Sequence, residues 1–439
     1  MAIRNPQSAI KRGLMKISCD IKINHLTRVE GHGNIRIRIK DGRVEEAAWD
    51  VVETPRFFEA MLVGKLWENA PWLCGRICGI CSIGHTLASI RAVEQAFGIV
   101  PDRQTIALRL LLKHMETLQS HILHLYFLAA PDFLHLGSVL PLLASHPEVV
   151  QRAARLKLLA NDACDLIGGR RIHPTRPVVG GFTMLPEKSQ LAALKSRLEA
   201  ALPDLAATAE LFQTFTLPDF VRETEFVSLQ GGDQYPFIGG NLVSSDGVVR
   251  SENEYRLMSN EYLVDHSTSK WSRLSRASFA VGALARVNNN FTLLHPQAVK
   301  IATAFGLRPV NHNPFMNHIA QLVECVHVVM DSIALLEELL AAPWWGDPGQ
   351  PVRPREGRGV AAVEVPRGIL YHAYEFDRAG RIIRADCVIP TSQNNANIHY
   401  DIIELARQAA AQGRPDSEIQ RLAGMLVRAY DPCISCSVH

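Results

Sequence analysis

The clearest pattern near the start of the chain is an alternation of apolar and polar residues along 21–48. Ile35, Ile37 and Ile39 alternate with basic residues and lead into turn-forming residues at 40–43. This pattern predicts a β-hairpin with one buried face. A similar alternation over residues 364–385 predicts a second short β region near the C-terminus.

Most of the remaining chain follows a helical period. Several stretches are apolar on every side, which is typical of helices buried in the core of a bundle. An Asn-rich stretch beginning at Pro390 predicts instead a loop over residues 390–397. The predicted helices cover residues 86–95, 105–128, 148–166, 188–212, 272–294, 318–342 and 417–429.

Together these elements predict an α+β fold that is mostly α, with a large helical-bundle core and small antiparallel β elements near both termini. We expect a single domain, residues 1–439, because no low-complexity linker divides the chain. Within it, residues 20–60 are expected to form an N-terminal β layer on the helical core. Residues 364–439 are expected to form a β and loop segment that carries a metal-binding clip.

The composition limits partners and location. The chain is 47% hydrophobic and 21% charged with a formal net charge of +2, so nothing favours nucleic acid or a membrane surface. No run reaches the roughly 18 uninterrupted apolar residues of a spanning helix, so no direct membrane span is expected. No secretory signal is visible either, and we expect a cytoplasmic protein.

The nine cysteines suit a reducing compartment with a metal or redox site better than a disulfide framework. Five of them are scattered, and each is expected to be a small buried residue. These five are Cys19, Cys74, Cys164, Cys325 and Cys387.

The other four cysteines form two Cys-x-x-Cys clips at opposite ends of the chain, and each clip is closely followed by a histidine. Two thiolates this close can point at one ion from a single turn, and four of them make a soft metal site. Ligands so near the C-terminus also predict a buried terminal segment. The residues are Cys78, Cys81 and His85 in the first clip, and Cys433, Cys436 and His439 in the second.

Taken alone, the clips leave alternatives open. A structural zinc site could join the two chain ends, although zinc ribbons usually bring their pairs together over roughly 15–20 residues. Here nearly the whole chain intervenes, which makes zinc the weaker interpretation. A disulfide fits poorly with a reducing compartment.

Further motifs lie at residues 27–33, at 56–59, at 365–368 with His372, and at Pro390 with Thr391. With these motifs and the two cysteine clips, the chain resembles the large subunit of nickel–iron hydrogenases. The resemblance covers essentially the whole sequence. The segment 168–174 and the last four residues are most similar to the cytoplasmic, NAD(P)-linked branch of that family.

The resemblance implies a nickel–iron centre with carbon monoxide and cyanide ligands on the iron. Cys78 and Cys433 would be terminal nickel ligands, while Cys81 and Cys436 would bridge nickel to iron. The residues implied around the diatomic ligands are Pro366, Arg367, Pro390 and Thr391. Those implied at a magnesium or similar hard cation are Glu59, His439 and the backbone carbonyl of Cys387.

The implied reaction is the reversible heterolytic cleavage of dihydrogen to protons and electrons. The proton would pass to the Cys433 thiolate or the Arg367 guanidine, and Glu30 would be the first relay beyond Cys433. His85 would donate to the thiolate of Cys436. Many relatives carry Asp where this chain has Ser120, so Asp431 becomes the main candidate for the carboxylate that pairs with Arg367.

Each of these residues also has a plainer interpretation. Glu30 could be an ion-pair partner of Arg28, Glu59 a solvated helix residue, and His85 a core histidine. Three further histidines share one helix face and could line the cofactor or make core hydrogen bonds. They are His114, His121 and His124.

The sequence has no iron–sulfur motif beyond the clips, no Gly-x-Gly-x-x-Gly after a strand and no P-loop. Electrons would therefore leave through an iron–sulfur small subunit, and further flavin or iron–sulfur subunits would serve a soluble acceptor, expected to be NAD(P). Another soluble acceptor (deazaflavin or heterodisulfide-linked), a zinc-stapled relative without catalysis, and a descendant that has lost catalysis are the alternatives. The resemblance also implies nickel-insertion factors and a maturation endopeptidase that removes a tail after His439.

Overall fold

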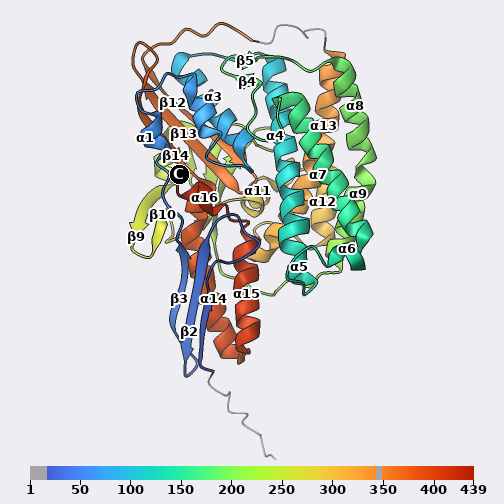
Figure 1. The fold of residues 1–439 in the computed structure, drawn as a ribbon, viewed down its shortest axis with the longest axis vertical. Helices are drawn as coiled ribbons and strands as arrows, with labels where there is room; N and C mark the ends of the chain where they lie inside the picture. The colour runs from blue at the N-terminus through green and yellow to red at the C-terminus, as the bar shows by residue number, and fades with distance from the viewer. Residues whose placement is uncertain (1–16, 343–348) are drawn as a thin grey trace, which may run out of the picture.

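The computed structural model describes residues 17–342 and 349–439. A group of long helices, α4, α7, α8, α9 and α13, stands on one side of the molecule (Figure 1). The sheet β12–β14 with α3 lies on the other side, and the strands β2 and β3 extend beside α14. The C-terminus lies next to α16, close to β14. The arrangement confirms the predicted α+β class with a helical core.

The helices follow one another along the whole chain. The α-helices are α1 Phe58–Leu62, α2 Asn69–Cys74, α3 Ser82–Phe97, α4 Arg103–Leu123, α5 Ala130–Phe133, α6 Leu142–Ser145, α7 Pro147–Gly168, α8 Lys188–Ala200, α9 Leu202–Gln213, α10 Tyr255–Met258, α11 Ala283–Asn290, α12 Pro296–Ala304, α13 Asn317–Ala341, α14 Pro390–Gln412, α15 Asp416–Ala429 and α16 Ile434–Ser437. A π-helical segment, η1 His124–Ala129, continues α4, and the 3₁₀ turns are η2 Glu252–Glu254, η3 Phe291–Leu293 and η4 Pro314–Met316.

The strands form small sheets. They are β1 Cys19–Ile23, β2 Gly33–Lys40, β3 Arg43–Val51, β4 Pro177–Val178, β5 Gly181–Phe182, β6 Glu225–Gln230, β7 Asn241–Ser244, β8 Val249–Arg250, β9 Asn260–Val264, β10 Ser267–Arg273, β11 Phe279–Ala280, β12 Gly357–Val365, β13 Gly368–Phe376 and β14 Ile382–Val388.

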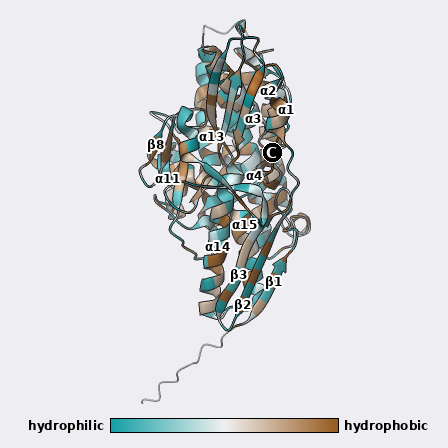
Figure 2. Ribbon diagram, turned by 90° about the vertical axis from the view of Figure 1, so that its left-hand side faces the viewer, coloured by the Kyte–Doolittle hydropathy of each residue, from teal (hydrophilic) through white to brown (hydrophobic). Residues whose placement is uncertain are grey.

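The predicted N-terminal hairpin is confirmed. β2 and β3 pair antiparallel around Asp41 and Gly42, both of which adopt positive φ as a two-residue hairpin turn requires. Ile35 and Ile37 are fully buried against the core, and β1 adds a third strand. Apolar and polar residues are mixed along these strands beside α14 (Figure 2). The alternation therefore reflects one face packed on α14 and one face in solvent.

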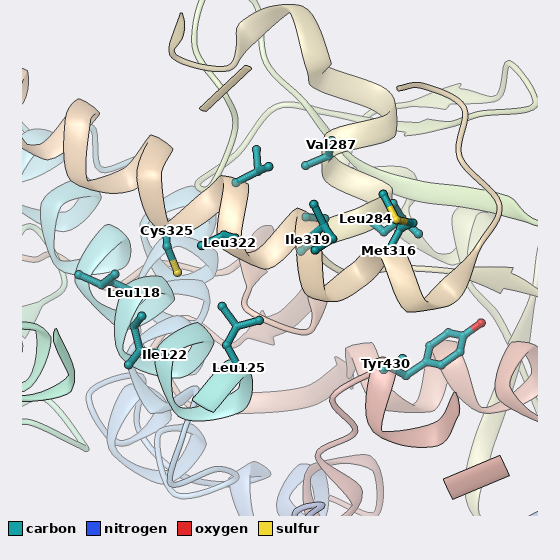
Figure 3. Packing of buried hydrophobic residues seen from close by; sticks show 14 of the residues in the cluster. Leu118, Ile122, Leu125, Leu284, Val287, Met316, Ile319, Leu322, Cys325 and Tyr430 are labelled. Atoms are coloured by element: carbon teal, nitrogen blue, oxygen red, sulfur yellow. The ribbon is translucent and has the colours of Figure 1, made fainter. Parts of the chain in front are cut away.

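The helical core is built on α4, α7 and α13. α4 begins where the side chain of Asp102 accepts a hydrogen bond from the Thr105 amide at 2.7 Å. Figure 3 shows Leu118 and Ile122 of α4 beside Leu322 and Cys325 of α13. By length and composition alone, residues 314–341 could cross a membrane, but 72% of their most apolar window is buried. The packing is that of a core helix.

The loop predicted over residues 390–397 is wrong, because these residues are the first turns of α14. Pro390 occupies the first helical position, where its missing N–H costs nothing. The polar side chains are buried and bonded to other segments. Asn394 accepts from the Val281 amide at 2.8 Å, and Asn395 accepts from the Trp49 indole at 3.1 Å. The polar residues of this stretch therefore make buried hydrogen bonds and do not indicate a loop.

Two helix predictions are also wrong in part. The stretch 188–212 is two helices, α8 and α9, because Pro203 cannot continue the helix that precedes it. The stretch 272–294 holds only α11 and η3, after the end of β10 and the short strand β11. The middle of the chain also contains three small sheets that were not predicted, with the strand orders β4-β5, β11-β6-β7-β8 and β10-β9.

Candidate metal centre

The two predicted cysteine clips meet in the interior. Cys81 stands immediately before α3, and Cys433 immediately before α16. The sulfur of Cys433 lies 3.5 Å from that of Cys78 and 2.6 Å from that of Cys436, and the sulfurs of Cys81 and Cys436 are 4.0 Å apart. All four residues are at most 3% exposed, and none forms a disulfide. Four free thiols packed this closely can converge on one metal centre.

Residues 30–33 hold the C-terminal segment in place. The backbones of Glu30 and Cys433 form a parallel β-bridge, and the Ile434 amide donates to the Glu30 carbonyl at 3.0 Å. Gly31 has a φ of +82°, and a Cβ there would lie 2.8 Å from the Cβ of Ile434. Only glycine combines this backbone conformation with so close an approach.

Arg56 joins the two clips, a role that the sequence did not reveal. Its guanidinium donates to the carbonyl of Ile77 at 2.7 Å, next to the first clip, and to that of Ser435 at 2.5 Å, inside the second. Its amide also donates to the Val438 carbonyl at 2.8 Å. One side chain therefore fixes both pairs of cysteines relative to each other.

Glu30 lies against the sulfur of Cys433. The Cys433 thiol donates to one carboxylate oxygen of Glu30 at 3.2 Å, and the Ser435 amide donates to the same oxygen at 3.0 Å. The Ser435 hydroxyl donates to the other oxygen. Arg28 pairs with Asp132 instead of Glu30. Glu30 is only partly buried, so its carboxylate connects the sulfur to the outer part of the molecule.

Arg367 lies on the opposite side of the cysteines and is paired with Asp431. Its guanidinium donates to the Asp431 carboxylate at 2.8 Å and to the Asp431 carbonyl at 2.6 Å. The hydroxyl of Ser120 is 3.4 Å away. Burial alone would lower the pKa of Arg367, but the negative charge of Asp431 raises it above the usual value. The guanidinium is therefore permanently charged.

Behind Arg367 lies Arg286, which the sequence did not single out. It is fully buried and donates to the carbonyls of Val365 at 2.9 Å and Pro366 at 3.1 Å. Its charge is balanced by the buried carboxylates of Glu324 and Glu364, at 2.6 and 2.9 Å. Arg286 thus fixes the turn that aims Arg367 at the site.

Thr391 and Pro390 lie at the start of α14, beside the second clip. The Cys433 amide donates to the Thr391 hydroxyl at 3.0 Å. The sequence resemblance implied a contact between this hydroxyl and a diatomic ligand; the structure shows that the hydroxyl fixes the backbone of Cys433.

His85 contacts a second histidine. Its Nδ1 lies 3.1 Å from Nε2 of His372, and a ring nitrogen of His85 is within 4.8 Å of the sulfurs of Cys81 and Cys436. Its buried Nε2 has no hydrogen-bond partner among the described residues. Burial and the nearby His372 lower the pKa of His85 well below its usual value, so the ring is neutral. The resemblance implied a hydrogen bond from His85 to the Cys436 sulfur, and no such bond is present among the described residues.

The residues predicted to bind a hard cation also meet. His439 Nε2 is 2.8 Å from the Cys387 carbonyl and 3.7 Å from the Glu59 carboxylate. The same Glu59 oxygen accepts from the Cys387 amide at 2.8 Å. Burial raises the pKa of Glu59, but the nearby His439 and the Cys387 amide lower it to about 2. An anionic oxygen, a carbonyl and an imidazole thus converge.

The three histidines of the α4 region make core hydrogen bonds. His114 bonds to Ser332 at 3.1 Å, His121 to Glu324 at 2.7 Å and His124 to Gln321 at 2.5 Å. Each is buried. The plainer interpretation accounts for all three, although Gln321 also reaches Asp431 at 3.3 Å.

Comparison with known proteins decides between the alternatives. Residues 56–157 and 265–439 match the family model of nickel-dependent hydrogenases, and residues 20–54 match a HoxL-like model. The chain belongs to the nickel-dependent hydrogenase family. It is 39% identical over 422 residues to the alpha subunit of sulfhydrogenase 1 of Pyrococcus furiosus, across 95% of this chain and 97% of that protein.

Other members of the family show the same full-length match. A subunit of the F420-non-reducing hydrogenase of Methanothermobacter marburgensis is 31% identical, across 94% of this chain and 93% of that protein. A crystal structure of an NAD+-reducing [NiFe]-hydrogenase matches with a TM-score of 0.86 and 27% identity, across 96% of this chain and 99% of that chain. The protein is the large subunit of a nickel–iron hydrogenase, an oxidoreductase. Membership of this family argues against a zinc site that only joins the two chain ends. The four buried thiols fit the nickel–iron centre that the family implies.

Proposed function

We propose that this hydrogenase passes electrons from dihydrogen, through iron–sulfur clusters of its small subunit, to NAD(P). The observation that carries this proposal is the match at a TM-score of 0.86 to an NAD+-reducing [NiFe]-hydrogenase, over nearly the full length of both chains. The beta subunit of the NAD-reducing hydrogenase HoxS of Cupriavidus necator is also similar over 96% of this chain. The second candidate is the same chemistry coupled to another soluble acceptor, because the relatives are not all NAD-reducing hydrogenases by name.

The test is the purified complex that contains this chain, supplied with hydrogen and one acceptor at a time. Reduction of NAD+ or NADP+, followed at the absorbance of the reduced nicotinamide, is the expected result. Reduction of a viologen dye alone would show an active centre with a different physiological acceptor. No hydrogen-dependent reduction of any acceptor, with nickel present, would contradict hydrogenase activity itself.

When bound, the nickel–iron centre supplies the polarisation that splits dihydrogen heterolytically. Four residues would hold it: Cys78, Cys81, Cys433 and Cys436. We further propose carbon monoxide and cyanide on the iron, beside Pro366, Arg367, Pro390 and Thr391. Infrared absorption in the carbonyl and cyanide region, where protein does not absorb, tests this assignment.

The Cys433 sulfur is the best placed proton acceptor. Arg367 is already protonated and paired with Asp431, so it can attract an anion but has no site for another proton. Cys433 lies 3.2 Å from Glu30, and a carboxylate can take a proton from a sulfur and release it outward with little movement. The proposed route therefore runs from Cys433 to Glu30 and then to solvent.

The proposed hard cation is magnesium, held by Glu59, His439 and the Cys387 carbonyl. Its role would be structural, because it would tie His439 to the strand β14 and so close the segment that carries Cys433 and Cys436. Magnesium content of the purified complex, compared between the native chain and Glu59→Gln, tests the assignment. Equal content in both would contradict it.

Burial of the second clip also has consequences for assembly. Cys433 and Cys436 are at most 1% exposed, so the closed segment leaves metals no direct access from solvent, and we propose that they enter before it closes. We therefore propose nickel-insertion factors and a maturation endopeptidase as transient partners. The lasting partners would be flavin-containing subunits together with an iron–sulfur small subunit. We propose a cytoplasmic location for the complex.

A further inference from the structure

A second group of metal-binding side chains lies outside the four-cysteine centre. Cys74 is the last residue of α2, while His372 and Cys387 are directly opposite each other on β13 and β14. Cross-strand partners point to the same face of a sheet, and α2 brings Cys74 to that face. One ligand atom from each of the three residues lies within 4.8 Å of the other two. Two of the cysteines expected to be isolated thus share one site.

A fourth donor completes the group. The Tyr374 hydroxyl lies 3.1 Å from the Cys74 sulfur and 2.6 Å from Nδ1 of His372. Tyr374 follows His372 by two positions on β13, so both side chains point to the same face. Two sulfurs, one nitrogen and one oxygen therefore converge from three segments. All four residues are at most 1% exposed.

The orientation of His372 suits metal binding. Its Nε2 lies 3.1 Å from Nδ1 of His85, which leaves Nδ1 as the nitrogen that faces Cys74 and Tyr374. A histidine that binds a metal usually holds its other nitrogen in a hydrogen bond that fixes the ring. Here Nε2 of His372 would donate that bond to His85, the histidine next to the four cysteines.

Charge and geometry favour one particular class of ion. Two thiolates neutralise a divalent cation, so the site can be buried without a net charge. Two sulfurs with imidazole and one further donor match the tetrahedral sites of zinc, and a fully buried set leaves no open position for a substrate. We propose that Cys74, His372 and Cys387 bind one zinc ion, with the Tyr374 hydroxyl as the fourth donor. The site is structural and joins α2 to the sheet β12–β14.

The test is the zinc content of the complete purified complex, measured together with nickel and iron. We expect Cys74→Ala and Cys387→Ala to lose one zinc per complex relative to the native chain. The matched control is Cys325→Ala, which removes an equally buried lone thiol from α13 and should retain all the zinc. Zinc unchanged in both site variants would overturn the proposal.

A second measurement on the native complex covers the case in which the variants fail to fold. X-ray absorption at the zinc edge is blind to nickel and iron, and should show two sulfurs at about 2.3 Å and nitrogen or oxygen at about 2.0 Å. No zinc, with all thiols free after unfolding, would overturn the proposal. A Cys74–Cys387 disulfide would overturn it as well. Mass spectrometry would detect it as two linked peptides whose mass is two hydrogens below the sum of the separate peptides. Nickel measured in the same samples separates this result from failure of the proposed function.

Discussion

The two sides of the four-cysteine centre differ in how they treat charge. On one side, Glu30 is partly buried and touches the Cys433 sulfur at 3.2 Å. On the other, Arg367 and Asp431 form an ion pair at 2.8 Å, and both are at most 3% exposed. A carboxylate near the outside can exchange a proton, whereas a closed ion pair keeps its charges fixed.

The difference teaches how one small site can both move and hold charge. Glu30 is held by groups of the C-terminal clip itself, through Ser435 and Cys433. Arg367 is held by the buried core, through Asp431 and the turn fixed by Arg286. We therefore expect changes at Glu30 to affect proton transfer, and changes at Arg367 to affect the field at the metals.

The largest effect should come from removing a cysteine, which breaks both sides at once. Replacing any of the four by Ala takes away one of very few strong ligands, and the coordination shell cannot close over the gap. We expect nickel content and hydrogen turnover to fall to background. Elemental analysis of Cys436→Ala, with Cys164→Ala as a buried-thiol control, checks this; native nickel in Cys436→Ala would contradict the assignment.

Glu30→Gln tests the side of the four-cysteine centre on which Glu30 can exchange a proton. Gln keeps the shape and loses the titratable group, so the metals and their infrared bands should remain. The rate of hydrogen–deuterium exchange should fall about 100-fold or more, the range of general acid–base effects. Glu45→Gln, an exposed position on β3, is the control. Exchange near the native rate would place the relay elsewhere.

Arg367→Lys tests the opposite side, on which the Arg367–Asp431 ion pair keeps its charges fixed. Lys keeps the positive charge but cannot reproduce the planar fork that donates to both the carboxylate and the carbonyl of Asp431. We expect the cofactor to bind and the rate to fall about tenfold, or about 1.4 kcal/mol on the barrier. A rate within about twofold of the native enzyme would reduce Arg367 to a packing residue.

The smallest effect on the rate is expected from Thr391→Val, which changes no side chain of the Glu30–Cys433 contact or of the Arg367–Asp431 pair and acts on stability instead. The change removes the acceptor of the buried Cys433 amide, which should cost about 1–3 kcal/mol of stability. Thermal unfolding should detect the loss, while Thr391→Ser, which keeps the hydroxyl, should restore most of it. Identical stability in Val and Ser variants would show that the amide finds another partner.

Much of this fold could be predicted from periodicity. The hairpin β2–β3 and the helices α4, α7, α13 and α15 follow from local patterns. Each of these elements buries either one face or its whole surface, and its apolar residues repeat accordingly. The loop prediction at residues 390–397 failed for a physical reason. Its Asn394 and Asn395 side chains bond to distant segments, the residues just before α11 and β10, and such contacts leave no local signal.

The candidate site, like the fold, could be predicted only in part from the sequence. The cysteines and His439 could be found because their types and spacing suit metals, and Glu59 could be found only through the family motif at residues 56–59. The roles of Arg56, Arg286 and Tyr374 could not be predicted from the sequence, because an arginine that bonds to carbonyls, or a tyrosine beside a thiol, follows no fixed sequence spacing. Their roles depend on which distant elements meet.

The bridge between Glu30 and Cys433 joins residues 403 positions apart. A ribosome that adds about 5–20 residues per second needs roughly 20–80 s to make that interval. For most of this time Cys78 and Cys81 exist without the other two thiols. The centre is therefore a late product of synthesis, and any ion that reaches the nascent chain meets only half of its coordination shell.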